Sequence, residues 1–186
     1  MKNNYEPLTQ SQSLLWIGQE MNPESPMYNM VMTYELKVQI SVMHFQKAFE
    51  KLIQEYDALR SVFQINEGIP TQVFLPDHTY DLEIIDFSNE EDPENRYNLW
   101  LQNRITKRFD ISVCLLDSVL IKLHDSHYIW YINQHHLITD AWSNSLLFSK
   151  IAHYYKAYKN EEPLLAIQEE FSYKKYIQQE LSLIHI

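Results

Sequence analysis

Two neighbouring stretches, 115–123 and 128–136, constrain the fold more than any other feature of the sequence. Both are rich in β-branched and aromatic residues. Only the four residues from His124 to His127 separate them, which predicts an antiparallel hairpin. An isolated hairpin is marginally stable in water. The remaining chain must therefore supply further strands and helices that cover the resulting sheet.

The rest of the sequence contains both kinds of element. Apolar residues at helical spacing predict helices over 8–21, 41–56, 95–109, 140–158 and 171–180. Short β-rich runs predict strands over 28–38, 60–65, 71–75 and 82–87. The second and third of these strands would form a hairpin through Asn66-Glu67-Gly68. The predicted class is α/β or α+β, with a mixed and mostly antiparallel sheet flanked by helices.

Composition excludes several functions. The chain has only two glycines, Gly18 and Gly68, so it lacks a glycine-rich phosphate loop, and chemistry on ATP or NAD is not expected. A net charge of -10 disfavours binding to nucleic acid or to an anionic membrane. The single Cys114 excludes an internal disulfide and a cysteine-based metal site, and suits a reducing cytosol.

We expect no contact with a membrane. The first residues lack the apolar stretch of a signal peptide, and no apolar run reaches the length that spans a bilayer. The expected location is therefore the cytoplasm.

The segment from His135 to Asp140 follows the second strand of the predicted hairpin. Side chains alternate along a strand, so His135 and His136 point to opposite faces and do not chelate one ion together. One of them can be structural while the other faces a cleft and accepts a proton. On residue chemistry alone, His136 can equally be a hydrogen-bonded histidine at the sheet end. Asp140 can likewise be a first-turn carboxylate that favours the helix dipole, with Thr139 as N-cap.

Other polar residues are expected to be structural or solvated, and no metal site is expected. His124 and His127 flank a turn and are interpreted as surface residues. Cys114 has no base beside it in the sequence and is interpreted as structural. The alternating carboxylates could be called a metal cluster, but a solvated strand face explains them as well: Asp81, Glu83 and Asp86.

The order His-His-x-x-x-Asp at a strand end, here within 135–143, resembles that of the condensation domains of nonribosomal peptide synthetases. Three further segments resemble the family's motifs in the family's order. The segment 8–16 resembles the opening motif. The segment 55–63 resembles the second motif, in which Leu59, Arg60 and Phe63 match. The segment 171–176 loosely resembles the fourth. The resemblance covers about residues 8–180.

The resemblance implies a fold. Residues 1–180 would form the N-terminal lobe of a two-lobed structure related to chloramphenicol acetyltransferase, with the C-terminal lobe absent. Residues 181–186 are apolar, which is typical of a truncated or non-native end. Reactants in the family enter a tunnel between the two lobes. We therefore expect the isolated chain to be inactive.

The resemblance also implies roles for individual residues. His136 matches the catalytic histidine, which acts as general base or positions the acceptor amine, and His135 matches a structural histidine. Asp140 matches a carboxylate that would pair with Arg60 and fix the loop beneath His136. Ala141 stands where the family usually has glycine. It is a candidate for lining the cleft, together with Trp142 and Ser143; for Trp142, core packing is the favoured interpretation.

The implied reaction is amide-bond formation by acyl transfer. Its substrates would be thioesters on the phosphopantetheine of donor and acceptor carrier-protein domains, and the lobe itself would bind no cofactor. One alternative is another acyltransferase of the same superfamily, dependent on coenzyme A or forming an ester. An epimerisation domain and a non-catalytic interaction module also stay open.

Overall fold

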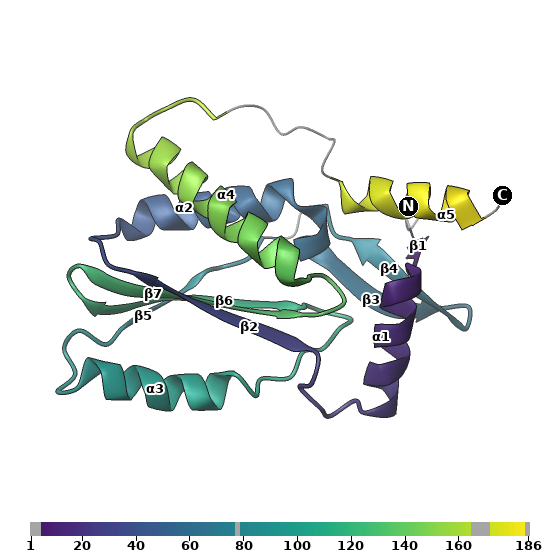
Figure 1. Cartoon of the computed structure of the whole chain (residues 1–186), viewed down its shortest axis with the longest axis horizontal. Helices are drawn as coiled ribbons and strands as arrows, with labels where there is room; N and C mark the ends of the chain where they lie inside the picture. The colour runs from purple at the N-terminus through teal and green to yellow at the C-terminus, as the bar shows by residue number, and fades with distance from the viewer. Residues whose placement is uncertain (1–4, 77–78, 165–171, 185–186) are drawn as a thin grey trace.

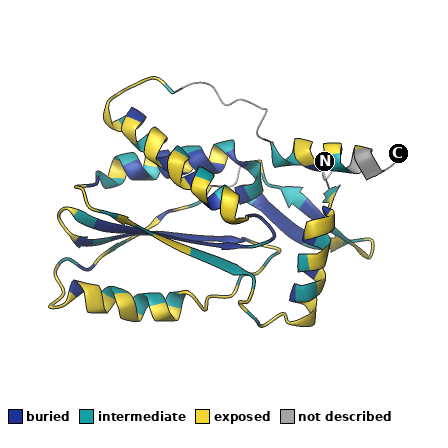
Figure 2. Cartoon of the chain, viewed as in Figure 1, coloured by how far each residue is buried: buried dark blue, intermediate teal, exposed yellow. Residues whose placement is uncertain are grey.

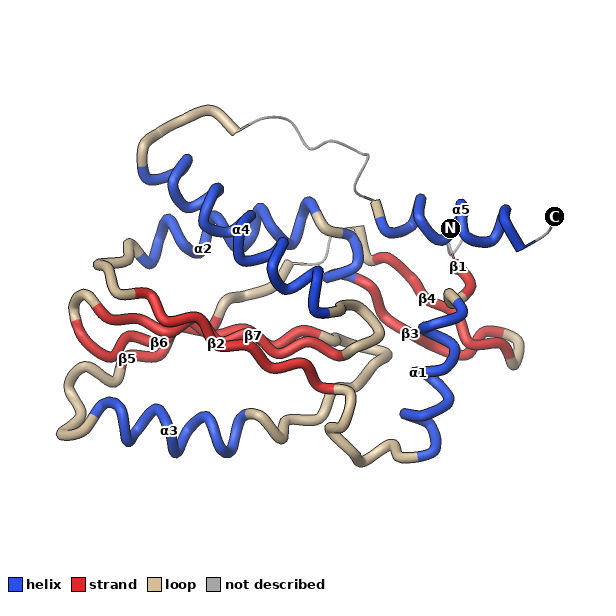
Figure 3. Tube along the Cα trace, viewed as in Figure 1, coloured by secondary structure: helices blue, strands red, loops and turns tan. Residues whose placement is uncertain are grey.

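The structure, a computed structural model, describes residues 5–76, 79–164 and 172–184. Strands and helices alternate along the chain (Figure 1, Figure 3). The strands are β1 (Tyr5–Pro7), β2 (Asn29–Leu36), β3 (Ser61–Asn66), β4 (Ile69–Phe74), β5 (Glu83–Asp86), β6 (Leu116–His124) and β7 (His127–His135). The helices are α1 (Gln10–Met21), α2 (Val42–Glu55), the short 3-10 helix η1 (Asp57–Arg60), α3 (Pro93–Arg104), α4 (Ala141–Lys159) and α5 (Tyr173–Ile184).

The larger sheet has the strand order β2-β7-β6-β5. Its centre is the predicted hairpin of β6 and β7, and β2 adds antiparallel to β7. Among the strands of the described ranges, only β5 pairs parallel, with β6. A smaller antiparallel sheet has the order β1-β4-β3, and its hairpin turns through Glu67 and Gly68, both at positive φ. The predicted mixed and mostly antiparallel architecture is confirmed, and it is divided between two sheets.

Helices cover both faces of the larger sheet. Figure 1 shows α2 and α4 on one face and α3 on the other. The alternation along β7 supplies both cores: Trp130 and Ile132 belong to the cluster with α2 and α4, whereas Ile129 and Tyr131 belong to the cluster with α3. Trp130 and Tyr131 are both fully buried, as the dark strands of Figure 2 illustrate. β7 is therefore apolar on both faces and lies between two layers of helices.

Several helix boundaries differ from the prediction. The third helix begins at Pro93, because Asp92 caps it through the backbone N–H of Asn95, and it ends at Arg104 rather than at Phe109. The fourth helix is capped by Asp140 and not by Thr139, because Thr139 is buried in the preceding loop. Among the described residues, no helix is long and apolar enough to cross a membrane.

Candidate active site

The segment that follows β7 turns sharply away from the sheet. The backbone N–H of His135 bonds to Leu115, and that of His136 bonds to the carbonyl of Tyr28 at 2.8 Å. The N–H of Ile138 then returns to the carbonyl of His135 at 3.0 Å. Residues 136–140 therefore form a short loop that is anchored at the strand ends and leads into α4.

His135 is buried, and both of its ring nitrogens are hydrogen-bonded within the protein. Its side chain is 2% exposed, and its Nδ1 accepts the backbone N–H of Leu137 at 3.1 Å. Its Nε2 therefore carries the proton and donates to Oε1 of Gln19 at 3.0 Å. The amide of Gln19 is oriented by donation from its own Nε2 to three carbonyls of the loop after α1. Burial lowers the pKa of His135 to about 4, so the ring is neutral.

His136 has a different environment and a defined tautomer. The side chain is half-buried, and its Nδ1 lies 2.8 Å from the carbonyl oxygen of Thr139. Because a carbonyl can only accept, Nδ1 must carry the hydrogen when the ring is neutral. The lone pair is then on Nε2. A neutral imidazole held in this way can accept a proton from a group that approaches Nε2.

A pocket of about 470 Å³ lies over this loop, and all four motif segments contribute to it. Thr9, Ser11 and Gln12 come from the first, Ala58 from the second, and Tyr173 and Tyr176 from the fourth. The third contributes His136 to Asp140 together with Ser143. Segments that are far apart in the sequence therefore meet around His136. Phe171, the first residue of the fourth segment, lies outside the described residues.

Gln12 is a contributor that the sequence did not single out. Its side chain is 2% exposed, and its Nε2 donates to the carbonyl of Leu137 at 2.9 Å. The amides of Gln12 and Gln72 also bond to each other, at 2.9 and 3.2 Å. The residue after His136 is thus tied to α1 and, through β4, to the smaller sheet. The capping box of Thr9 and Gln12 orders the same end of α1.

The predicted pair of Asp140 and Arg60 is wrong. Asp140 caps α4, since its Oδ1 accepts the backbone N–H and the hydroxyl of Ser143, both at 2.7 Å. These bonds lower the pKa of Asp140. Arg60 instead donates to the carbonyls of Ile53 and Gln54, at the end of α2, and to those that follow β4. Asp140 bonds at the N-terminus of α4, where the helix dipole favours a negative charge. Arg60 bonds at the C-terminus of α2, where the dipole favours a positive charge.

Asp57 was also missed, although it lies within the second motif. Its carboxylate accepts from the hydroxyl of Ser172 and from the backbone N–H groups of Tyr173 and Lys174, at 2.6 to 3.3 Å. It therefore accepts backbone N–H groups that would otherwise lack a partner in the first turn of α5. This helix carries Tyr173 and Tyr176 of the pocket. Burial raises the pKa of Tyr173 to about 12, so its phenol is neutral beside the pocket. The sequence separation of about 115 residues hides this contact from local pattern analysis.

The three residues after Asp140 have different environments. Ser143 lines the pocket and bonds to Asp140. Trp142 is 81% exposed, so the expectation that it packs in the core is wrong. It lies on the first turn of α4. Ala141 is also exposed and is not among the residues that line the pocket.

The environments of Glu83, Asp86 and Cys114 agree with the structural interpretation. Glu83 pairs with Arg104 at 2.7 Å, and Asp86 accepts from Ser88, so these carboxylates have separate partners. The pKa of Cys114 is raised by burial, which favours an unreactive thiol.

Comparisons with known proteins agree with this arrangement. The family model described as "Condensation domain" matches residues 2–184. A dimodular nonribosomal peptide synthase of Bacillus subtilis is 28% identical over 81% of this chain and 6% of its own length. A component of the linear gramicidin synthase of Brevibacillus parabrevis is 28% identical over 86% of this chain and 2% of its own length.

Two solved structures have the same fold. The starter condensation domain of rhizomide synthetase superposes with a TM-score of 0.88 at 20% identity, over 96% of this chain and 45% of that one. The first condensation domain of the calcium-dependent antibiotic synthetase gives 0.88 at 21% identity, over 98% and 44%. The chain thus spans under half of each solved domain. The chain belongs to the condensation domain family of nonribosomal peptide synthetases, and it corresponds to one lobe of such a domain.

Proposed function

We propose that this lobe contributes the proton-accepting histidine of an amide-forming acyl transfer, in a protein that also contains a second lobe. The observation that carries the proposal is the tautomer of His136. Its Nδ1–H is fixed on the carbonyl of Thr139, which leaves the lone pair of Nε2 available to a substrate. No other described histidine lines the pocket where the four motif segments meet.

In the proposed reaction, the acceptor amine attacks the carbonyl carbon of the donor thioester. A C–N bond forms and the C–S bond breaks. The amine proton passes to Nε2 of His136 and then to the departing thiolate, which leaves as a thiol. His136 can act as the base or can position the amine by accepting its hydrogen bond. His135 remains neutral throughout, because burial and two hydrogen bonds fix it.

The proposed substrates are acyl or aminoacyl groups carried as thioesters on the phosphopantetheine of donor and acceptor carrier-protein domains. Membership of the condensation family supports this assignment, since its relatives include peptide synthases. The lobe itself would hold no cofactor. Its partners would be the two carrier domains and the C-terminal lobe.

A second candidate is acyl transfer from coenzyme A. A variant of the rhizomide starter condensation domain, similar in fold at a TM-score of 0.89, was solved in complex with C8-CoA and Leu-SNAC. That neighbour is 20% identical, so the likeness concerns the fold. The two candidates share the same role for His136 and differ in the carrier of the donor.

The test uses a protein in which this lobe is continued by its second lobe. His136→Ala should lower the rate of amide formation by about 10²- to 10⁴-fold, the range expected for a lost general base. The matched control is His153→Ala, since His153 is exposed on α4, away from the pocket. Supplying one acyl group on a carrier protein or on coenzyme A distinguishes the two donors. An unchanged rate in His136→Ala, with the fold intact by circular dichroism, would refute the proposed role.

A further inference from the structure

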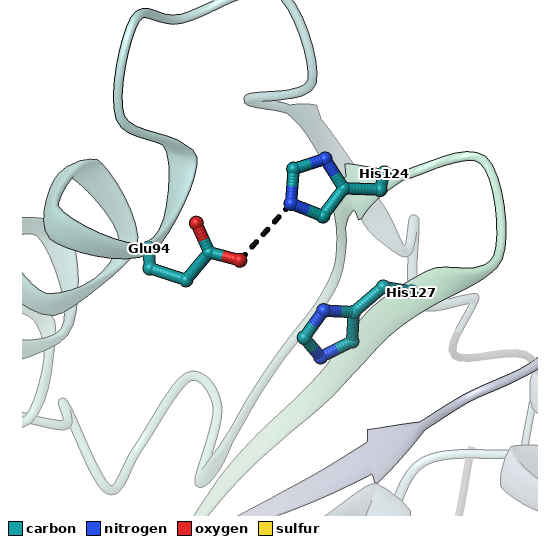
Figure 4. Close-up of side chains that lie close together, drawn as sticks. All are labelled: Glu94, His124 and His127. Carbon is teal, nitrogen blue, oxygen red and sulfur yellow. Dashed lines mark hydrogen bonds and ion pairs between the residues drawn. The ribbon is translucent and has the colours of Figure 1, made fainter.

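A second group of polar side chains lies at the opposite end of β7 from the pocket. His124 and His127 flank the two-residue turn of the β6–β7 hairpin and are direct cross-strand partners. Cross-strand partners have their side chains on the same face of the sheet. The two imidazole rings have centroids 6.1 Å apart and an interplanar angle of 32°. The turn therefore holds two potential nitrogen ligands next to each other, as Figure 4 shows.

Glu94 joins them from a different element. It lies in the first turn of α3, and its Oε1 is 3.0 Å from Nε2 of His124. One ligand atom from each of Glu94, His124 and His127 lies within 4.8 Å of the others. Tetrahedral zinc with bonds of about 2.0–2.2 Å needs ligand atoms about 3.3–3.5 Å apart. The side chains of His124 and Glu94 are 50% and 53% exposed, so small rotations can bring the ligand atoms to the spacing that zinc needs.

A further carboxylate lies beside His127. Nε2 of His127 lies 2.9 Å from Oε1 of Glu35 on β2, and the other oxygen of Glu35 lies 3.2 Å from the ammonium group of Lys37. Histidines that bind metals commonly donate their other ring N–H to a carboxylate. A carboxylate this close to Nε2 favours Nδ1 of His127 as the ligand atom.

We propose that Glu94, His124 and His127 bind Zn²⁺ or a neighbouring late first-row divalent ion. Two imidazole nitrogens and one carboxylate oxygen suit such ions, whereas Mg²⁺ and Ca²⁺ favour oxygen ligands. Water would fill the fourth position. The ion would connect the tip of the β6–β7 hairpin to the start of α3. His127 and His135 are at opposite ends of β7, eight residue steps or roughly 26 Å apart at 3.3 Å per residue. The role of the ion is therefore structural and independent of acyl transfer.

The test is calorimetric titration of the 186-residue chain with ZnCl₂ in a buffer that does not chelate metals. We expect one ion bound per chain, and a melting temperature that rises with Zn²⁺ concentration. His124→Ala and Glu94→Gln should each weaken binding at least tenfold and reduce the thermal shift. His153→Ala, which removes an exposed histidine elsewhere, should leave both unchanged. MgCl₂ should give neither binding heat nor thermal shift.

Three results would overturn the proposal. The first is no uptake of Zn²⁺ by the unmodified chain. The second is unchanged affinity in His124→Ala and Glu94→Gln, since binding would then lie elsewhere. The third is an equal loss in His153→Ala. Circular dichroism of each variant establishes that the fold is retained; both test substitutions are at exposed positions, where little loss of stability is expected.

Discussion

His135 and His136 are neighbours in the sequence with opposite environments. His135 has both ring nitrogens bonded within the protein and is almost fully buried. His136 has one nitrogen bonded to a backbone carbonyl and lies at the wall of a pocket. The difference follows from strand alternation at the end of β7, together with the turn that Leu137 and Ile138 make into the core. Two identical side chains thus acquire different protonation chemistry.

The lowered pKa of His135 predicts a pH dependence of stability. The unfolded imidazole takes up a proton near pH 6.5, whereas the folded one does so near pH 4, so the free energy of unfolding falls as pH decreases through this window. Between pH 7 and pH 5 the expected loss is about 2 kcal/mol. Urea unfolding of the chain at both pH values measures it. His135→Gln should remove this part of the slope. The same slope in His135→Gln as in the unmodified chain would contradict the assignment, and His153→Gln serves as the control.

Helix termini organise the pocket at the scale of elements. Asp140 caps α4, Asp57 satisfies the first turn of α5, and Arg60 bonds to the carbonyls at the end of α2. Each charge is placed where the helix dipole stabilises it. The family motifs therefore act here partly through helix capping, which positions the elements that surround His136.

Because Asp140 and Arg60 have separate partners, we expect them to contribute independently to the free energy of unfolding. Asp140→Ala should cost about 1 kcal/mol, the usual value of a lost N-cap, whereas Asp140→Asn should cost less because Asn also caps. In a double-mutant cycle with Arg60→Met, the free energies of unfolding should add within about 0.5 kcal/mol. A coupling energy well above 1 kcal/mol would indicate a direct pair and contradict the geometry.

Asp57 is expected to control the docking of α5. Asp57→Ala removes the acceptor for Ser172, Tyr173 and Lys174, so α5 should open more often. Amide hydrogen exchange in α5 should accelerate while protection in α2 stays unchanged. The exposed Asp81→Ala is the matched control. Equal exchange in α5 of the two variants would show that α5 is held by other contacts.

At the scale of the whole molecule, the described residues form one side of the candidate site. The pocket is bordered by α1, η1, the loop after β7, α4 and α5, and the chain spans under half of the solved condensation domains that it matches. Apolar residues are exposed on α1, including Leu14 at 73% and Met21 at 75%. We infer that a second lobe supplies the opposite wall.

This arrangement predicts that the isolated chain does not catalyse amide formation. Without an opposite wall, water is not excluded and the acceptor amine is not oriented, so the loss of positioning should leave the rate at the uncatalysed background. The comparison is between this chain alone and the same chain continued by a second lobe, with identical acyl and aminoacyl thioesters. Turnover by the isolated chain that depends on His136 would contradict the need for a second lobe.

The sequence by itself determined the elements and the place of the candidate site. Alternation in 115–136 predicted the central hairpin, and apolar spacing predicted the helices. His136 was indicated by the resemblance of the His-His-x-x-x-Asp segment to a family motif. The hairpin and the helices depend on residues that are close in the sequence, so local patterns predict them. The prediction missed the boundaries of α3, whose start depends on the cap Asp92 and on Pro93.

Only the tertiary structure decided which groups meet. It placed Gln12 beneath the carbonyl of Leu137, paired Asp57 with the start of α5, and separated Arg60 from Asp140. It also brought Glu94 to His124 and His127 across 30 residues of chain. The physical reason is that side-chain hydrogen bonds are directional over about 3 Å, whereas sequence patterns specify faces and periods. Partners at long sequence separation are fixed by packing alone.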